Sequence, residues 1–135
     1  FKTFHGSYNN NKIKIEEILH PLIYKESLRQ IKETTKAAYI VIVIPLLFET
    51  KKYHELIDES LLVDCSEDLQ LDRILDRDRI SYELAKKIIE AQMSRKDKVR
   101  KASTVIENIS SKKILKKNIL YYHKNILRKL NEKLL

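Results

Sequence analysis

Hydrophobic residues along the chain follow two spacings, one typical of strands and one of helices. Residues 39–44 (YIVIVI) form an unbroken apolar and mostly β-branched run that stops at Pro45. Such a run predicts a strand covered on both faces, as in the centre of a parallel sheet. Shorter runs predict two more strands, at 60–65 and 103–108. Because helical patterns separate these strands, we expect an α/β fold with a three-layer parallel sheet flanked by helices.

Apolar residues at helical spacing predict the remaining elements. The pattern over 13–31 is interrupted at His20-Pro21, which predicts two helices that meet at this dipeptide. Ser66 and Ser81 each precede acidic residues and are expected to be helix N-caps. The other helices are expected near 53–57, at 66–77, 81–92 and 95–101, and after a cap at Ser110 or Ser111.

Length and cysteine content bound the class of protein. A chain of 135 residues suits one domain, and a lone cysteine, Cys65, excludes an internal disulfide framework and a multi-cysteine zinc site. A reducing, cytoplasmic setting is therefore expected. No apolar stretch approaches the roughly 20 residues that span a bilayer, so no membrane association is expected. Because the chain starts at Phe1 and its one methionine is Met93, we expect it to be a fragment.

Charge is distributed unevenly along the chain. The formal net charge is +8; residues 1–67 carry 9 Lys and Arg against 10 Asp and Glu, whereas residues 68–135 carry 18 against 9. The basic half should attract an anionic partner. Nucleic acid is one candidate, but the chain shows no aromatic platform or nucleic-acid-binding motif. The C-terminal lysines are equally well explained as a solvated helix surface.

Two arginines in the basic half are candidates for phosphate binding. Gln70, Arg73 and Arg77 are spaced at i, i+3 and i+7 of one predicted helix, so they share a face just beyond a strand. A guanidinium offers paired donors to phosphate oxygens and keeps its charge, which suits stabilisation of a transferring phosphoryl group. Pairing of these arginines with nearby aspartates is an equal alternative, which spacing cannot decide.

Five ordered segments resemble dephospho-coenzyme A kinase. They are EILHPLI (17–23), PLLFE (45–49), LLVDCSEDLQLDRILDRD (61–78), AQMSRKDK (91–98) and VIEN (105–108). The resemblance implies a P-loop kinase fold in which ATP and Mg²⁺ are used to phosphorylate the ribose 3′-hydroxyl of dephospho-coenzyme A. This reaction is the last step of coenzyme A synthesis. The implied partners are small molecules, ATP and dephospho-coenzyme A, and not nucleic acid.

The resemblance also assigns parts and residues. It implies substrate-side helices at about 12–36, core strands and a helix at 37–76, a lid at 77–101, and a core strand and C-terminal helix at 102–135. The implied roles are catalysis by Arg73 and Arg77, substrate binding by His20, Leu46, Leu47 and Glu49, nucleotide binding by Asn108, and lid contacts by Gln92, Arg95 and Lys98. For Glu49 an orienting role is preferred to that of a general base. No metal ligand is assigned.

One departure from the family concerns phosphate binding. The glycine-rich P-loop with its lysine and the acidic motif after it match no residue here, and Gly6 is the one glycine of the chain. The resemblance therefore implies that this chain alone is inactive. A non-catalytic nucleotide- or anion-binding module that has lost the P-loop stays open as an alternative.

Overall fold

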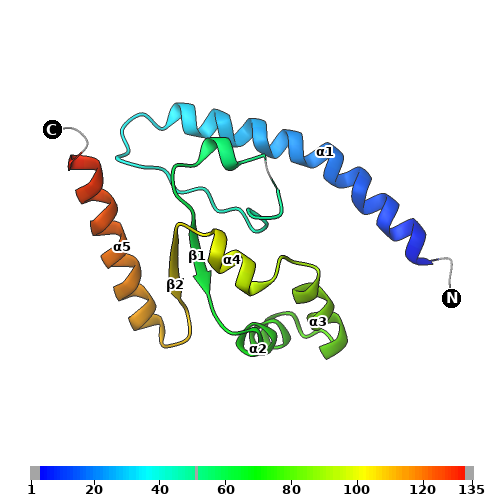
Figure 1. Cartoon of the computed structure of the whole chain (residues 1–135). Coiled ribbons are helices and arrows are strands. Elements are labelled where there is room, and N and C mark those ends of the chain that lie inside the picture. Colours follow the sequence, from blue (N-terminus) through cyan, green and yellow to red (C-terminus); the bar gives the residue numbers. More distant parts are fainter. Residues whose placement is uncertain (1–3, 51, 133–135) are drawn as a thin grey trace. The chain divides into compact units, whose positions relative to one another are not determined.

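The structure of the chain, a computed structural model, describes residues 4–50 and 52–132. The chain forms two compact units, Phe1–Ile42 and Val43–Leu135, which are described separately. The first unit holds helix α1 (Phe4–Glu33). The second holds the 3₁₀ helix η1 (His54–Leu56), β1 (Leu61–Asp64), α2 (Glu67–Asp78), α3 (Tyr82–Glu90), α4 (Arg95–Lys101), β2 (Thr104–Glu107) and α5 (Lys112–Glu132) (Figure 1).

Helix α1 corrects the expectation of two helices that meet at His20-Pro21. It runs unbroken through Pro21. The proline ring fixes φ near −65°, which a helix accepts, and the cost is a missing N–H donor and crowding against the preceding turn. Further along, Arg29 bridges Glu26 at 2.7 Å and Glu33 at 2.6 Å. The hydrogen bonds from Arg29 lower the pKa of Glu26 to about 2.

The sheet of the second unit is parallel, as predicted. β1 pairs with β2 in a register that places Leu61 beside Thr104 and Asp64 beside Glu107. At the amino ends of the strands, the Ser60 N–H donates to the Ser103 hydroxyl at 3.1 Å, and the Ser103 N–H donates to the Ser60 hydroxyl at 3.0 Å. Ser60 is buried, so this exchange satisfies polar groups removed from water.

The expected strand at 39–44 is wrong for this structure. These residues form no strand, and Val41 and Val43 are 71% and 88% exposed rather than covered on both faces. A strand needs a neighbour to bond its N–H and C=O groups. Within the described ranges 4–50 and 52–132, the sheet consists of β1 and β2 alone. The expected three-layer sheet is therefore reduced here to a two-stranded parallel sheet with helices.

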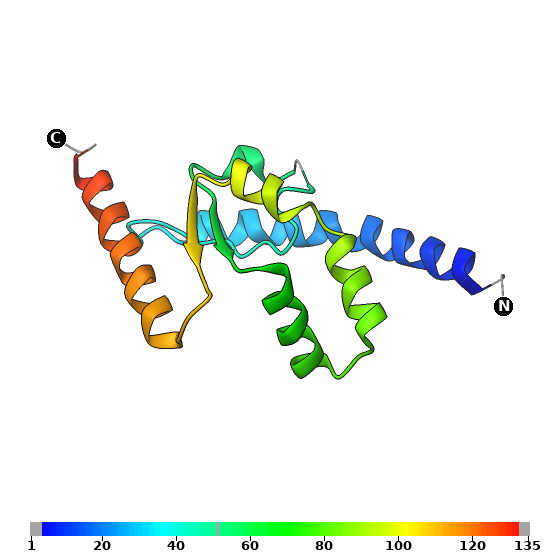
Figure 2. The same cartoon turned by 60° about the horizontal axis from the view of Figure 1, so that its bottom comes forward.

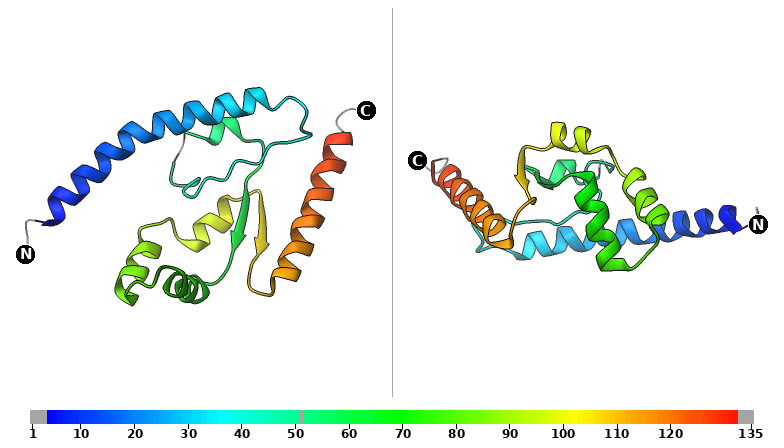
Figure 3. Two further views of the ribbon diagram at one scale, coloured as in Figure 1. Left: turned by 180° about the vertical axis from the view of Figure 1, so that it is seen from behind. Right: turned by 90° about the horizontal axis from the view of Figure 1, so that it is seen from below.

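Helices of the second unit flank this sheet. α4 packs beside β1 and α5 beside β2, while α2 and α3 pack on each other. The views of Figures 2 and 3 agree on this order, with α5 and α4 on opposite sides of the strand pair. Ala85 of α3 is fully buried, and Ile106 of β2 is 6% exposed.

Serine caps begin the helices where the sequence predicts them. The side chains of Ser66, Ser81 and Ser111 accept hydrogen bonds from Leu69, Leu84 and Ile114 N–H groups, respectively. Each cap satisfies an amide that the first helical turn leaves without a partner. Ser94 caps α4 in the same way, through the Asp97 N–H.

Candidate functional site at the carboxyl ends of the strands

The carboxyl ends of β1 and β2 meet at one edge of the sheet, and Arg73 lies there. The Asn108 N–H donates to the Asp64 carbonyl at 2.7 Å, which continues the strand pairing by one residue. Arg73 Nη2 then donates to the Asn108 carbonyl at 2.8 Å. Gln70, one turn earlier on α2, donates to the Cys65 carbonyl at 3.0 Å. The helix thus holds Gln70 and Arg73 against the edge where α/β proteins bind ligands.

The two arginines of α2 differ in their partners. Arg73 binds a neutral carbonyl and forms no ion pair among the described residues, so the alternative in which it pairs with Asp72 or Asp76 is not observed. Arg77 instead donates two hydrogen bonds to Asp78, at 2.6 and 2.7 Å. These bonds raise the pKa of Arg77 and lower that of Asp78. For Arg77 the local pairing predicted as an alternative is the observed one.

A second charged group at this edge was not expected from the sequence. Asp64, the last residue of β1, is 5% exposed and binds the guanidinium of Arg95 through both of its oxygens. The distances are 2.9 Å from Nε to Oδ1 and 2.6 Å from Nη2 to Oδ2. These hydrogen bonds raise the pKa of Arg95. A buried carboxylate is tolerated in a protein when it is paired in this way.

Glu49 lies in a third polar cluster, which joins the turn after Pro45 to the start of α4. Its carboxylate accepts the Met93 N–H at 2.8 Å and lies 3.9 Å from Lys98 Nζ. Lys98 in turn donates to the Gln92 side-chain carbonyl at 2.6 Å. Of the residues predicted for the site, the structure therefore brings Glu49, Gln92 and Lys98 together. We refer to this cluster with the Asp64–Arg95 pair as the α4 anchor.

Other predicted site residues lie apart from the α4 anchor or in the other unit. Leu46 is 47% exposed, and the carbonyl of Leu47 lies 3.2 Å from a ring nitrogen of His54. His20 is an exposed residue of α1 in the first unit. Asn108 takes part through its main chain, since both of the bonds described above use backbone atoms.

Two groups of the site were not predicted from the sequence, the Asp64 carboxylate and the Met93 main-chain N–H. Asp64 carries a weak signal, because a charged residue at the end of an apolar run (LLVD) must be paired if the strand is buried. The Met93 amide carries none, since any residue except proline supplies an N–H.

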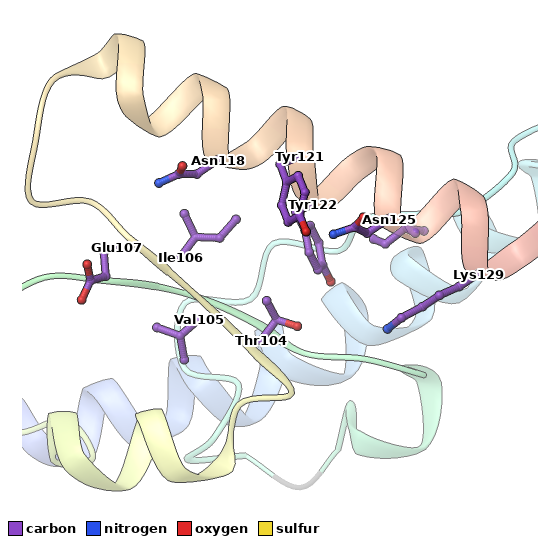
Figure 4. A pocket seen from close by; sticks show the side chains of 10 residues that line it. Thr104, Val105, Ile106, Glu107, Asn118, Tyr121, Tyr122, Asn125 and Lys129 are labelled. Atoms are coloured by element: carbon purple, nitrogen blue, oxygen red, sulfur yellow. The ribbon is translucent and has the colours of Figure 1, made fainter.

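A separate hollow of about 590 Å³ lies between β2 and α5. Tyr122 and Asn125 of α5 face Thr104 of β2 across it (Figure 4). Lys129, at one end, is paired with Glu59 at 2.8 Å. The residues predicted for the site do not line this hollow, although it reaches Glu107 at the end of β2.

Neither a metal-binding cluster nor a membrane-spanning helix is found among the residues that the structure describes. In the part of the chain that the structure describes, no three or more His, Cys, Asp or Glu side chains are grouped so as to hold a metal ion. Over the same residues, each helix is too short or too polar to cross a bilayer.

Comparison with known proteins gives matches that all carry the same description. The family model described as dephospho-CoA kinase matches residues 3–113. Dephospho-CoA kinase from Chromobacterium violaceum is 40% identical over 70% of this chain and 46% of the relative. The enzymes of the same name from Acinetobacter baylyi (40% identity) and Pseudoalteromonas translucida (36%) match over 84% and 90% of this chain, and 57% of each relative. The chain thus spans about half the length of the curated relatives it matches.

Solved structures with a similar fold include a protein from Thermus thermophilus. The crystal structure of TT1252 from Thermus thermophilus superposes with a TM-score of 0.72 at 24% sequence identity, covering 87% of this chain and 60% of that one. At this identity the likeness concerns the fold, and it supports the α/β arrangement described above.

Proposed function

This chain belongs to the dephospho-CoA kinase family, and we propose that the full-length protein transfers the γ-phosphoryl group of ATP to the 3′-hydroxyl of dephospho-coenzyme A. The bond from the γ-phosphorus to the bridging oxygen of ADP breaks, a bond forms from the γ-phosphorus to the ribose 3′-oxygen, and the hydroxyl proton is released. The 135-residue chain alone is proposed to be inactive, because Gly6 by itself cannot form a glycine-rich phosphate loop.

The observation that carries this proposal is the position of Arg73. Its guanidinium is held at the strand-end edge by a neutral acceptor, and no carboxylate of the described residues pairs with it. The fork is thus oriented without being neutralised. A preorganised cation in such a place can stabilise the charge that develops on a transferring phosphoryl group.

The other site residues are proposed in supporting roles. Arg77 is proposed as a second phosphate contact, which would require it to exchange Asp78 for the phosphate. Leu46, Leu47 and His20 are proposed to contact the acceptor substrate, and Asn108 the nucleotide. Gln92, Arg95 and Lys98 are proposed as parts of the lid, residues 77–101, whose closure would exclude water from the reaction.

ATP is proposed to bring a magnesium ion. The described residues hold no group of three or more His, Cys, Asp or Glu side chains around a metal position, and phosphate oxygens of ATP would supply ligands to the ion. When bound, it would neutralise charge between the β- and γ-phosphates. No role of the residues described here depends on its position.

The test is a coupled assay of ADP release by the full-length protein. With ATP, Mg²⁺ and dephospho-coenzyme A, release should rise well above the rate without acceptor. A folded protein that gives no release with this acceptor, but does so with another nucleoside or nucleotide, would overturn the proposed substrate.

A further inference from the structure

We propose that Glu49 and Asp64 are positioning residues that hold α4 to the core, so that the moving part of the lid ends at Gln92 rather than at Lys101. This inference rests on the proposed function, because it divides the lid of that kinase into a mobile and a fixed part. Glu49 and Asp64 contact α4 and the turn before it, and act on the reaction through them.

The Asp64–Arg95 pair is the first support. Asp64 is the last residue of β1, and the first residue of α4 supplies its partner. If Arg95 moved away, the Asp64 carboxylate, which is 5% exposed, would lose the positive charge that pairs with it. Removing one partner from a buried pair is strongly unfavourable, so the start of α4 should stay with the strand as the lid moves.

The Glu49 cluster is the second support, and it comes from a different part of the core. Glu49 accepts the Met93 N–H, and the Lys98 ammonium of α4 lies between Glu49 and Gln92, which precedes the helix. The Lys98 and Glu49 side chains are 18% and 24% exposed, so this pair is partly shielded from solvent. Two independent core segments therefore hold residues 92–98.

Helix α3 is held in a different way. Among the residues described, its side-chain hydrogen bonds and ion pairs remain local, namely the Ser81 cap and the Lys86–Glu90 pair at 3.7 Å. Its buried Ala85 lies in the packing with α2. In the described part of the chain, no polar side-chain contact ties α3 to a strand. The non-helical residues 91–94 separate this helix from α4, and a hinge is expected at Ala91, before the residues that the anchor holds.

The experiment compares three variants of the full-length protein. Glu49→Ala removes the acceptor of the Met93 N–H, whereas Glu49→Gln keeps an acceptor oxygen and loses the charge. Arg100→Ala is the control, since it breaks an exposed pair with Asp97 on the same helix, outside the α4 anchor. Amide hydrogen exchange is measured without substrate for Met93 and for Ile106 of β2.

Glu49→Ala should speed exchange of the Met93 amide by about tenfold or more and leave Ile106 unchanged, as local opening does. Glu49→Gln and Arg100→Ala should leave both amides near the wild-type rate. Unchanged Met93 exchange in Glu49→Ala, or an equal rise at Met93 and Ile106, would overturn the inference. The second result would show a general loss of stability instead of a local anchor.

Kinetics with ATP and dephospho-coenzyme A give the functional readout. Loss of the anchor should change kcat and KM together in Glu49→Ala, as hinge substitutions do, and Glu49→Gln should restore most of the activity. Normal kinetics in Glu49→Ala would overturn the positioning role. A wild-type protein without kinase activity would overturn the proposed function, while the exchange data would still decide whether α4 is anchored.

Discussion

Two helices at the strand-end edge carry basic residues, and they use them differently. On α2, Arg73 binds a carbonyl and Arg77 binds the exposed Asp78. On α4, Arg95 binds the buried Asp64, and Lys98 lies between Glu49 and Gln92. Arg95 and Lys98 are therefore compensated by acids of the core, whereas no acid of the described residues compensates Arg73.

This difference shows why the charge of the basic half does not by itself define a binding surface. The residues from 68 onward carry 18 Lys and Arg against 9 Asp and Glu, but Arg95 and Lys98 pair with Asp64 and Glu49, which precede residue 68. An anion would have to displace a carboxylate from these two residues. For Arg73 it would have to displace only a carbonyl, which is the weaker competitor.

The largest effect is expected from Arg73→Lys, which keeps the charge and removes the fork. In the full-length protein, turnover should fall on the order of 10²-fold, as when one preorganised electrostatic contact is lost. ATP affinity should change much less, since the contact is made mainly in the transition state. Steady-state kinetics and nucleotide titration measure both. Arg100→Lys serves as the control on α4, and unchanged turnover in Arg73→Lys would remove Arg73 from the site.

Asp64→Asn on β1 should lower stability more than Glu107→Gln on β2. Asn keeps one acceptor but loses the charge that pairs with Arg95, so the free energy of unfolding should fall by about 1–3 kcal/mol. The matched control is Glu107→Gln, because Glu107 is the exposed register partner of Asp64. Urea unfolding of both variants gives the comparison. Equal losses would contradict the distinct role assigned to the buried carboxylate.

Arg77→Lys sharpens the contrast within α2. Because Asp78 already occupies two donors of Arg77, the fork is less available to a phosphate than that of Arg73. Turnover should therefore fall less than in Arg73→Lys, by about tenfold or less on the scale of one partly used electrostatic contact. A loss as large as that of Arg73→Lys would show that Arg77 leaves Asp78 during the reaction.

The smallest effect expected is the pH dependence of the stability that the exposed Arg77–Asp78 pair provides. Arg77 lowers the pKa of Asp78 below its ordinary value of 3.8, so the folded state favours the ionised carboxylate. The resulting stabilisation is present above pH 3.8 and is lost as pH falls through the lowered pKa. The difference in Tm between wild type and Asp78→Asn should thus be present at neutral pH and vanish in strong acid.

Local signals predicted most of the second unit. The serine caps located α2, α3 and α5, and the short apolar runs located β1 and β2 to within one residue at each end. Caps and apolar runs depend on residues that are close in the chain, so the sequence alone is enough to recognise them. The segment 39–44 has the same local signal, but strand formation also depends on a pairing partner that its own residues do not provide.

The site was less predictable, because its contacts join distant residues. Spacing placed Arg73 and Gln70 on one face of α2, but the Asn108 carbonyl that Arg73 binds lies 35 residues away. Glu49 and Met93 are 44 residues apart, and Asp64 and Arg95 are 31 apart.

The bond from the Met93 amide to Glu49 has a consequence for which substitutions this region can accept. The Glu49 carboxylate accepts a main-chain N–H, so the bond requires an amide at position 93 and does not depend on which side chain is there. Position 93 should therefore accept many residues without loss of this contact, while proline, which has no N–H, should abolish it. At position 49 only a side chain with an acceptor at the same reach can take its place. In a library of substitutions, position 93 should thus tolerate many residues, whereas position 49 should tolerate few.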